Sequence, residues 1–233
     1  MLILRKLKIL LSRFAIKAFD KWSSTYHYDA PLKLQRRGYT YEELACMVAS
    51  WLRLKDGSIL LDIGIGTGEL TKYLYFKGKV WIIGIDISKN MLYIASKHIN
   101  HISLIRCSAE ALPIANSRID GVCCTFVLHS ILDQGAALSE MNRVLKSGAR
   151  GVMVDLCIDG TSWLRKLCAF IHSIVYEHGA PALYRSPNEY KKMAELHGLK
   201  VIEIKQLGIK KTYTHFLFKF IKFMDKPFSK SSK

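Results

Sequence analysis

The chain has 233 residues, half of them hydrophobic, which is enough for one well-buried domain and excludes a disordered chain. Its net charge of +16 is concentrated at the ends: residues 1–21 carry six Lys or Arg against one Asp, and residues 205–233 carry eight Lys against one Asp. The two ends therefore hold +12 of the +16, which points to an anionic surface, either a membrane or a nucleic acid.

The first predicted element is a basic amphipathic segment over residues 1–38. It has no apolar run long enough to span a bilayer and no small-residue cleavage site of a secretory signal. A helical wheel puts one set of apolar residues on a single stripe: Ile3, Leu4, Leu7, Leu10, Leu11, Phe14, Ala18 and Trp22. Three roles stay open, namely a helix packed on the domain, a membrane-surface helix and a transit peptide.

From residue 39 the chain alternates between helical and strand patterns. Thr40 followed by Glu43 predicts a capping box at the start of a helix that ends near residue 52. Further helices are expected over residues 69–76, 88–99 and 135–148, and another that ends at Gly198. Strands are expected over residues 58–64, 80–87, 102–109, 119–131, 150–158, 199–207 and 211–223. Continuous apolar strands separated by amphipathic helices predict an α/β fold with a doubly wound, mostly parallel seven-stranded sheet.

The alternation of helical and strand patterns is interrupted at residues 160–185, which predict a helical insert before the last two strands. Its apolar run, residues 167–176, is too short to span a bilayer. The last two strands are expected to form an antiparallel pair. The main domain is therefore expected over residues 39–221, with a basic tail over 222–233.

The sequence "ILLDIGIGTGEL", residues 59–70, combines a buried strand with three alternating glycines. A triphosphate loop needs a lysine and a hydroxyl after its last glycine, where this chain has Glu69 and Leu70. A dinucleotide loop prefers the spacing G-x-G-x-x-G instead of G-x-G-x-G. Asp62 and Glu69 flank the loop, and two acids there would repel a pyrophosphate but suit a ligand with an ammonium and a sulfonium.

Asp86 lies 18 residues after Gly68, at the end of the second expected strand. An acid at that place can accept hydrogen bonds from both hydroxyls of a ribose. Strand, glycine loop, helix and a second strand ending in an acid together fit S-adenosylmethionine better than a nicotinamide dinucleotide.

The chain resembles the class I S-adenosylmethionine-dependent methyltransferases, in the group of the ubiquinone/menaquinone C-methyltransferases and related small-molecule enzymes. The resemblance covers roughly residues 40–157 and rests on four segments in order: "LLDIGIGTGELT", "IIGIDISKNML", "CSAEALPIANSRIDGVCCTFVLHSI" and "ALSEMNRVLKSGARGVMVD". It implies a Rossmann-like methyltransferase fold with S-adenosylmethionine as the cofactor.

The resemblance also implies the cofactor-binding residues. The methionine part would be held by the loop residues Asp62, Gly64, Gly66, Thr67 and Gly68. Asp86 would bind the ribose, and the adenine would lie beside Ile87, Ser108 and Ala109. Thr125 would end the fourth strand. Ser108 departs from the family, which commonly has Asp or Asn there, so the hydrogen bond to adenine is expected to be weaker or made by backbone. Ala149 stands where the family usually has a second glycine.

No catalytic residue is assigned, because methyl transfer from a sulfonium needs a general base only for some acceptors. His129, which follows the fourth strand, is a candidate for contact with the substrate. His27 and Tyr28 are further candidates, since they belong to a segment that resembles the pocket cover of this family.

Cysteine spacing indicates no metal site. The six cysteines form no C-x-x-C pair, and most lie in apolar runs, as expected of small core residues in a reducing compartment: Cys46, Cys107, Cys123, Cys124, Cys157 and Cys168.

The absence of two motifs narrows the class of molecule that could accept the methyl group. Enzymes that methylate the amines of nucleobases have an [N/D]-P-P-[Y/F] motif where this chain reads "TFVL", and Cys123 and Cys124 follow no proline, unlike the catalytic cysteine of many RNA cytosine-C5 enzymes. The sequence predicts transfer to a hydrophobic small-molecule or lipid acceptor of the quinone or prenyl-lipid type, at an anionic membrane surface met by the basic ends.

Two alternatives remain, an RNA- or tRNA-modifying methyltransferase and a non-catalytic partner protein with the same fold. The expected location is cytoplasmic, with peripheral membrane association, or mitochondrial if residues 1–22 are a transit peptide.

Overall fold

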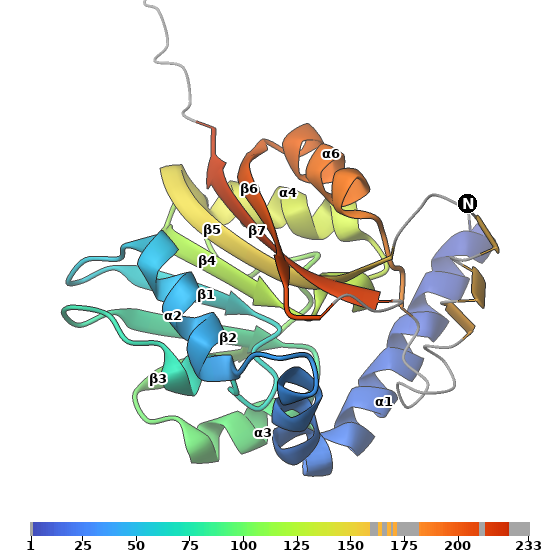
Figure 1. The fold of residues 1–233 in the computed structure, drawn as a ribbon. Helices are drawn as coiled ribbons and strands as arrows, with labels where there is room; N and C mark the ends of the chain where they lie inside the picture. The colour runs from blue at the N-terminus through green and yellow to red at the C-terminus, as the bar shows by residue number, and fades with distance from the viewer. Residues whose placement is uncertain are drawn as a thin grey trace, which may run out of the picture.

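The computed structural model describes residues 2–158, 163–164, 167–168, 170–171, 182–209 and 213–223. A sheet of seven strands in the order β3-β2-β1-β4-β5-β7-β6 forms its centre (Figure 1). The strands are β1 (Ile59–Ile63), β2 (Trp81–Asp86), β3 (Ile102–Arg106), β4 (Ile119–Thr125), β5 (Leu145–Ile158), β6 (Leu199–Leu207) and β7 (Tyr213–Lys222). β7 runs antiparallel to both of its neighbours, β5 and β6, and the pairings among β1 to β5 are parallel. The predicted doubly wound, mostly parallel sheet is confirmed.

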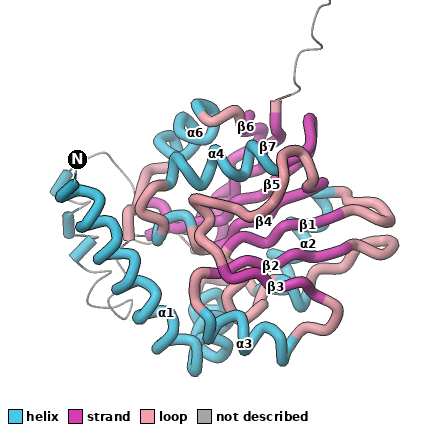
Figure 2. Tube along the Cα trace, turned by 180° about the vertical axis from the view of Figure 1, so that it is seen from behind, coloured by secondary structure: helices cyan, strands magenta, loops and turns pink. Residues whose placement is uncertain are grey.

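Helices cover both faces of the sheet, which is why its central strands are apolar on both sides. α4 (Gln134–Val144) and α6 (Pro187–Leu196) pack on one face, and α2 (Tyr41–Leu52) packs on the other with the end of α1 (Figure 2). α3 (Lys89–His98) lies beside β2 and β3. Cys123 and Cys124 of β4 are fully buried, so their predicted place in the core is confirmed.

Helix starts follow the capping residues of the sequence. Thr40 accepts a hydrogen bond from the backbone of Glu43 and forms the predicted capping box at the start of α2. Ser88 caps α3 as predicted, Asp133 caps α4, and Ser186 forms a second capping box at α6. These polar side chains satisfy backbone N–H groups that a helix start leaves open.

The N-terminal segment is one long helix, α1 (Leu2–Gln35), so the expected helix extends through the segment 23–35. The predicted apolar stripe is confirmed at Ala18, which is buried, and wrong at Leu10 and Phe14, which are exposed. Ala15 and Ser23, which are not in the stripe, are buried as well. These small side chains let the helix approach the domain closely, with Leu10 and Phe14 on its outward side. Within the described residues, no helix is both long and apolar enough to cross a membrane.

Several predicted elements have different bounds in the structure: the strand expected over residues 102–109 ends at Arg106, and the helix expected over 135–148 ends at Val144. The helix expected over residues 69–76 is only a 3₁₀ turn, η1 (Thr71–Tyr73), which lacks a side-chain cap and is followed by aromatic residues of low helix propensity. The strand expected over 119–131 ends at Thr125, because Phe126 adopts a φ of 60° and the turn η2 (Leu128–Ser130) follows. β5 begins five residues before the expected position 150, at Leu145.

The predicted helical insert, residues 160–185, lies mostly outside the described residues, although residues 163–164, 167–168 and 170–171 are helical. The end of the basic tail, residues 224–233, is also outside them.

Candidate functional site

The glycine loop leaves β1 in a backbone conformation that requires glycine. Gly64, Gly66 and Gly68 have φ values of +69°, +56° and +86°, a region that other residues rarely adopt. The loop is held to β2, since the N–H groups of Gly64 and Ile65 both donate to the carbonyl of Ile85, at 2.8 and 2.9 Å. Gly68 also lies against α3, because a Cβ there would come within 2.3 Å of Ile99.

Asp86 stands at the carboxyl end of β2, directly beside this loop. Its carboxylate accepts the backbone N–H of Gly66 at 3.0 Å and that of Ser88 at 2.8 Å. A carboxylate can accept about four hydrogen bonds, so Asp86 keeps capacity for two ligand hydroxyls.

A cavity of about 570 Å³ opens at the carboxyl ends of the strands. Its size falls in the usual range of small-molecule sites, roughly 300–1,000 Å³. Six predicted cofactor residues line it together: Gly64, Gly66, Asp86, Ile87, Ser108 and Ala109. The structure thus brings the ribose and adenine candidates to one cavity, as expected where parallel strands end.

The other predicted cofactor residues are not part of the cavity wall. Asp62 is buried behind the loop, where one carboxylate oxygen accepts the hydroxyl of Thr71 and the other has no hydrogen-bond partner among the described residues. Thr67 is buried and donates to Glu69 at 3.4 Å, and Thr125 ends β4 half-buried. Gly68 supports the loop from the side of α3, as described above.

α1 supplies a wall of the cavity, and the sequence indicated only its segment around His27 and Tyr28. Ser12, Ala15, Phe19 and Tyr26 all line the cavity. Asp20 attaches this helix to the cofactor side, because it accepts the hydroxyl of Ser88 and the N–H of Asn90. The alanines at positions 15 and 18 were the available signal, since small residues on one side of a helix permit close packing.

The two N-terminal candidates for substrate contact lie outside the cavity wall. Tyr28 is exposed, and the ring of His27 packs 3.9 Å from that of Tyr28 and 5.6 Å from that of His98. Their neighbour Tyr26 takes the place in the cavity that was expected of them. Within this segment Tyr26 lines the cavity, whereas His27 and Tyr28 do not.

His129 is buried and held by Asp155 of β5. Its Nδ1 lies 2.5 Å from one carboxylate oxygen of Asp155, and its backbone N–H donates to the other oxygen at 3.0 Å. His129 does not line the cavity, whereas Phe126, Val127 and Ser130 beside it do. This pair therefore fixes the cavity wall that follows β4 and is not itself placed against a ligand.

The site fits S-adenosylmethionine. The positive-φ glycines expose bare backbone to the methionine part, and Asp86 has free acceptor capacity for the ribose. Among the described residues, no three His, Cys, Asp or Glu side chains come together as metal ligands do.

Cofactor affinity is expected to depend on pH through Asp86. Burial raises the pKa of Asp86 to about 6, against the opposing effect of its backbone hydrogen bonds. The ribose hydroxyls donate to the ionised carboxylate, so the affinity should be constant above pH 7 and fall by up to about tenfold per pH unit below pH 6. Calorimetric titration of S-adenosylmethionine at pH 5, 6 and 7.5 measures this, and the same affinity at pH 5 and 7.5 would contradict it.

Comparison with known proteins agrees with this site. Residues 61–153 match the family described as a methyltransferase domain. Over 112 residues the chain is 29% identical to the ubiquinone/menaquinone biosynthesis C-methyltransferase UbiE of Geotalea uraniireducens, a match that covers 45% of this chain and 48% of the relative. The chain thus spans about half the length of the curated relatives that it matches.

Solved structures share the fold at low sequence identity. The geranyl diphosphate C-methyltransferase of Streptomyces coelicolor superimposes with a TM-score of 0.66 at 14% identity, over 77% of this chain and 75% of the other. That structure contains S-adenosyl-L-homocysteine. The YcgJ protein of Bacillus subtilis superimposes with a TM-score of 0.66 at 18% identity, over 78% of this chain and 99% of the other.

Proposed function

We propose that this chain, which carries a class I S-adenosylmethionine-dependent methyltransferase domain, methylates a hydrophobic small molecule of the quinone or prenyl-lipid type. The observation that carries the proposal is the apolar part of the cavity wall. The cavity is lined, beside the cofactor candidates, by the apolar side chains of Phe19, Phe126, Val127, Ile131 and Leu132.

This apolar wall comes from two parts of the chain that are distant in sequence. Phe19 belongs to α1, and the other four residues follow β4. The polar wall residues Asp86, Ser108 and Glu110 come from the ends of β2 and β3. An acceptor that binds beside the cofactor would therefore bury apolar surface, which favours a hydrophobic molecule over a nucleotide.

Bound S-adenosylmethionine supplies an activated methyl group on its sulfonium. The chain's own residues then have two tasks, alignment of the acceptor and exclusion of water. The backbone of the glycine loop and Asp86 fix the cofactor, while α1 covers the cavity through Phe19 and Tyr26. Ser12 and Ser130 are wall hydroxyls that can hydrogen-bond a polar group of the acceptor.

The curated relatives support the class of acceptor. Their printed names are those of ubiquinone/menaquinone C-methyltransferases. We also propose that the acceptor is drawn from an anionic membrane surface, cytoplasmic or mitochondrial, which the basic N-terminal end of the chain would meet.

Radiolabelled methyl transfer tests the acceptor. The purified protein is incubated with tritiated S-adenosylmethionine and either a polyprenyl quinol lacking one ring methyl or total tRNA. We expect label in the organic extract of the quinol reaction, and less label with Asp86→Ala when the cofactor is below saturation. Label in tRNA alone would promote the RNA-modifying alternative. Cofactor binding without transfer to quinols, prenyl lipids or RNA would support the non-catalytic alternative.

A further inference from the structure

We infer that one end of the molecule, formed by the N-terminal half of α1 and the described residues 163–164, 167–168 and 170–171, docks on an anionic lipid surface. The inference rests on the proposed function, because a lipid acceptor must pass from a bilayer into the cavity. Two ends of the molecule compete for this role. One lies beyond the carboxyl ends of the parallel strands, where the cavity opens, and the other lies at their amino ends.

The outward face of α1 has the character of an interfacial helix. Leu10 and Phe14 are 50% and 54% exposed, and Lys17 and Lys21 follow on the same face at helical spacing. Arg13 is exposed beside them. Apolar side chains can enter the acyl boundary there, while the long basic ones reach anionic headgroups.

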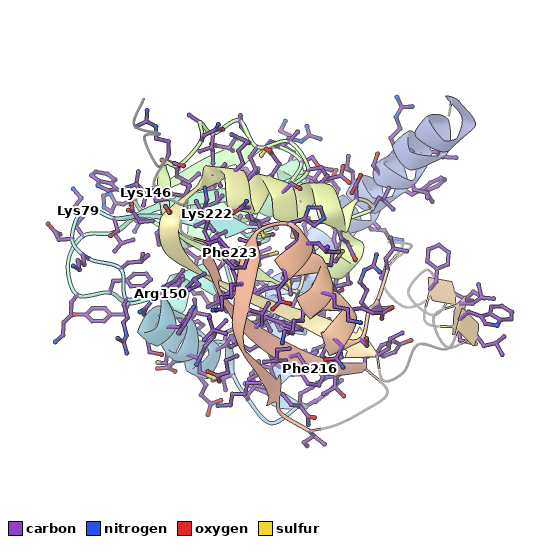
Figure 3. All side chains as sticks on the ribbon, turned by 90° about the horizontal axis from the view of Figure 1, so that it is seen from above. Lys79, Lys146, Arg150, Phe216, Lys222 and Phe223 are labelled. Carbon is purple, nitrogen blue, oxygen red and sulfur yellow. The ribbon has the colours of Figure 1, made fainter. Side chains whose placement is uncertain are left out.

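The described residues of the segment that follows β5 present a second apolar group at the same end. Trp163 is 69% exposed, and Leu164, Leu167 and Ile171 are exposed as well. In Figures 1 and 3 the short helical segments that contain these residues lie on the same side of the molecule as the N-terminal half of α1, and Figure 3 labels the basic residues on the opposite side. Tryptophan is enriched at the interface between membrane and water, which suits this position.

The proposed surface is continuous with the cavity through α1. Phe14 faces outward, while Ala15 and Phe19 line the cavity. Five residues of helix separate Phe14 from Phe19, a rise of about 7 Å along the axis. A hydrophobic acceptor that leaves a bilayer at Phe14 therefore reaches the cavity wall within less than two helical turns.

The opposite end is basic but less suited to this role. Figure 3 shows Lys79, Lys146, Arg150 and Lys222 together on the side away from α1. Several of these cations are already engaged: Lys146 pairs with Asp120 at 2.6 Å, and Lys222 donates to the carbonyl of Leu145 at 3.0 Å.

Arg150 lies over the ring of Trp51, 4.9 Å from its centroid. Docking through this basic end would also hold the cavity about 20 Å from the bilayer, the length of a seven-residue strand such as β4.

Vesicle flotation with matched variants tests the assignment. The probe is vesicles of phosphatidylcholine with phosphatidylglycerol, mixed with the wild-type chain or with one of two double variants. Leu10→Ser with Phe14→Ser is expected to lower the bound fraction at least about tenfold. Tyr75→Ser with Trp81→Ser removes two exposed aromatics elsewhere, with Trp81 at the amino end of β2, and should bind as the wild type does. Equal losses in both variants would overturn the assignment.

Fluorescence quenching by brominated phosphatidylcholine gives the orientation independently. In a variant that keeps Trp163 as its only tryptophan, vesicle binding is expected to quench the fluorescence. In a variant that keeps only Trp81, no quenching is expected. Quenching of Trp81 alone would place the basic end on the membrane and overturn the inference. So would binding to RNA but not to vesicles, or a dimer in solution that Phe14→Ser converts to a monomer.

An assay with detergent-dispersed quinol distinguishes a failure of this inference from a failure of the proposed function. If the variant with Leu10→Ser and Phe14→Ser methylates dispersed quinol normally but not quinol in vesicles, docking and acceptor are both supported. If the wild type binds vesicles through Trp163 but methylates no quinol, the docking surface stands and the proposed acceptor fails.

Discussion

Replacing Asp86 with alanine is expected to weaken S-adenosylmethionine binding by about 1–3 kcal/mol, or roughly 5- to 150-fold in Kd, the range for hydrogen bonds to a charged group. The substitution removes the acceptor for the ribose hydroxyls. It also releases the N–H groups of Gly66 and Ser88, which hold the loop and the start of α3.

Calorimetric titration of the cofactor measures this loss. Asp56→Ala is the matched control, because Asp56 likewise accepts a backbone N–H, that of Lys79 at 2.7 Å, but lies outside the cavity wall. We expect the control to bind the cofactor as the wild type does. An unchanged Kd in Asp86→Ala would remove the ribose assignment.

Gly64→Ala is expected to abolish methyl transfer and to lower the free energy of unfolding by about 2–4 kcal/mol. A Cβ at this position would lie 2.1 Å from Cγ2 of Val127, and its φ of +69° is unfavourable for alanine. The overpacked contact contributes about 1–3 kcal/mol and the backbone about 1 kcal/mol. Relief of the contact would displace Val127, which lines the cavity.

The substitution Gly57→Ala separates the effect of the contact with Val127 from the effect of the positive φ. Gly57 also has a positive φ, +76°, but a Cβ there would meet nothing within 4 Å. We expect a loss of only about 1 kcal/mol in chemical denaturation and nearly normal cofactor affinity. Equal effects of the two substitutions would mean that the contact with Val127 is unimportant.

The cofactor half of the site could be predicted from the sequence because its chemistry is local. Gly64, Gly66 and Asp86 follow directly from two strands, and parallel strands bring their carboxyl ends to one edge. Ile87, Ser108 and Ala109 follow by the same rule, and all of these residues line the cavity.

The acceptor half could not be predicted in the same way. Phe19 and Tyr26 reach the cavity only because α1 packs on α3 through Asp20, a contact between residues about 70 positions apart. The predicted stripe of α1 assigned Leu10 and Phe14 to a common apolar face, and no periodicity rule indicates which face a helix buries when alanines allow closer packing. The predicted strand over residues 119–131 likewise missed the turn at Phe126, whose φ of 60° depends on its surroundings.

The distribution of charge also shows which features the sequence determined and which depended on the tertiary structure. The sequence by itself determined the fold class, the cofactor loop, the acid at the end of β2 and the excess of basic residues at the two ends, because each depends on residue type and short spacing. Only the tertiary structure decided that Lys79, Lys146, Arg150 and Lys222, from three separate parts of the chain, share the amino edge of the sheet, and that α1 closes the cavity at the other. Both depend on contacts between residues far apart in the chain, whose free energy comes from packing surfaces that no local pattern specifies.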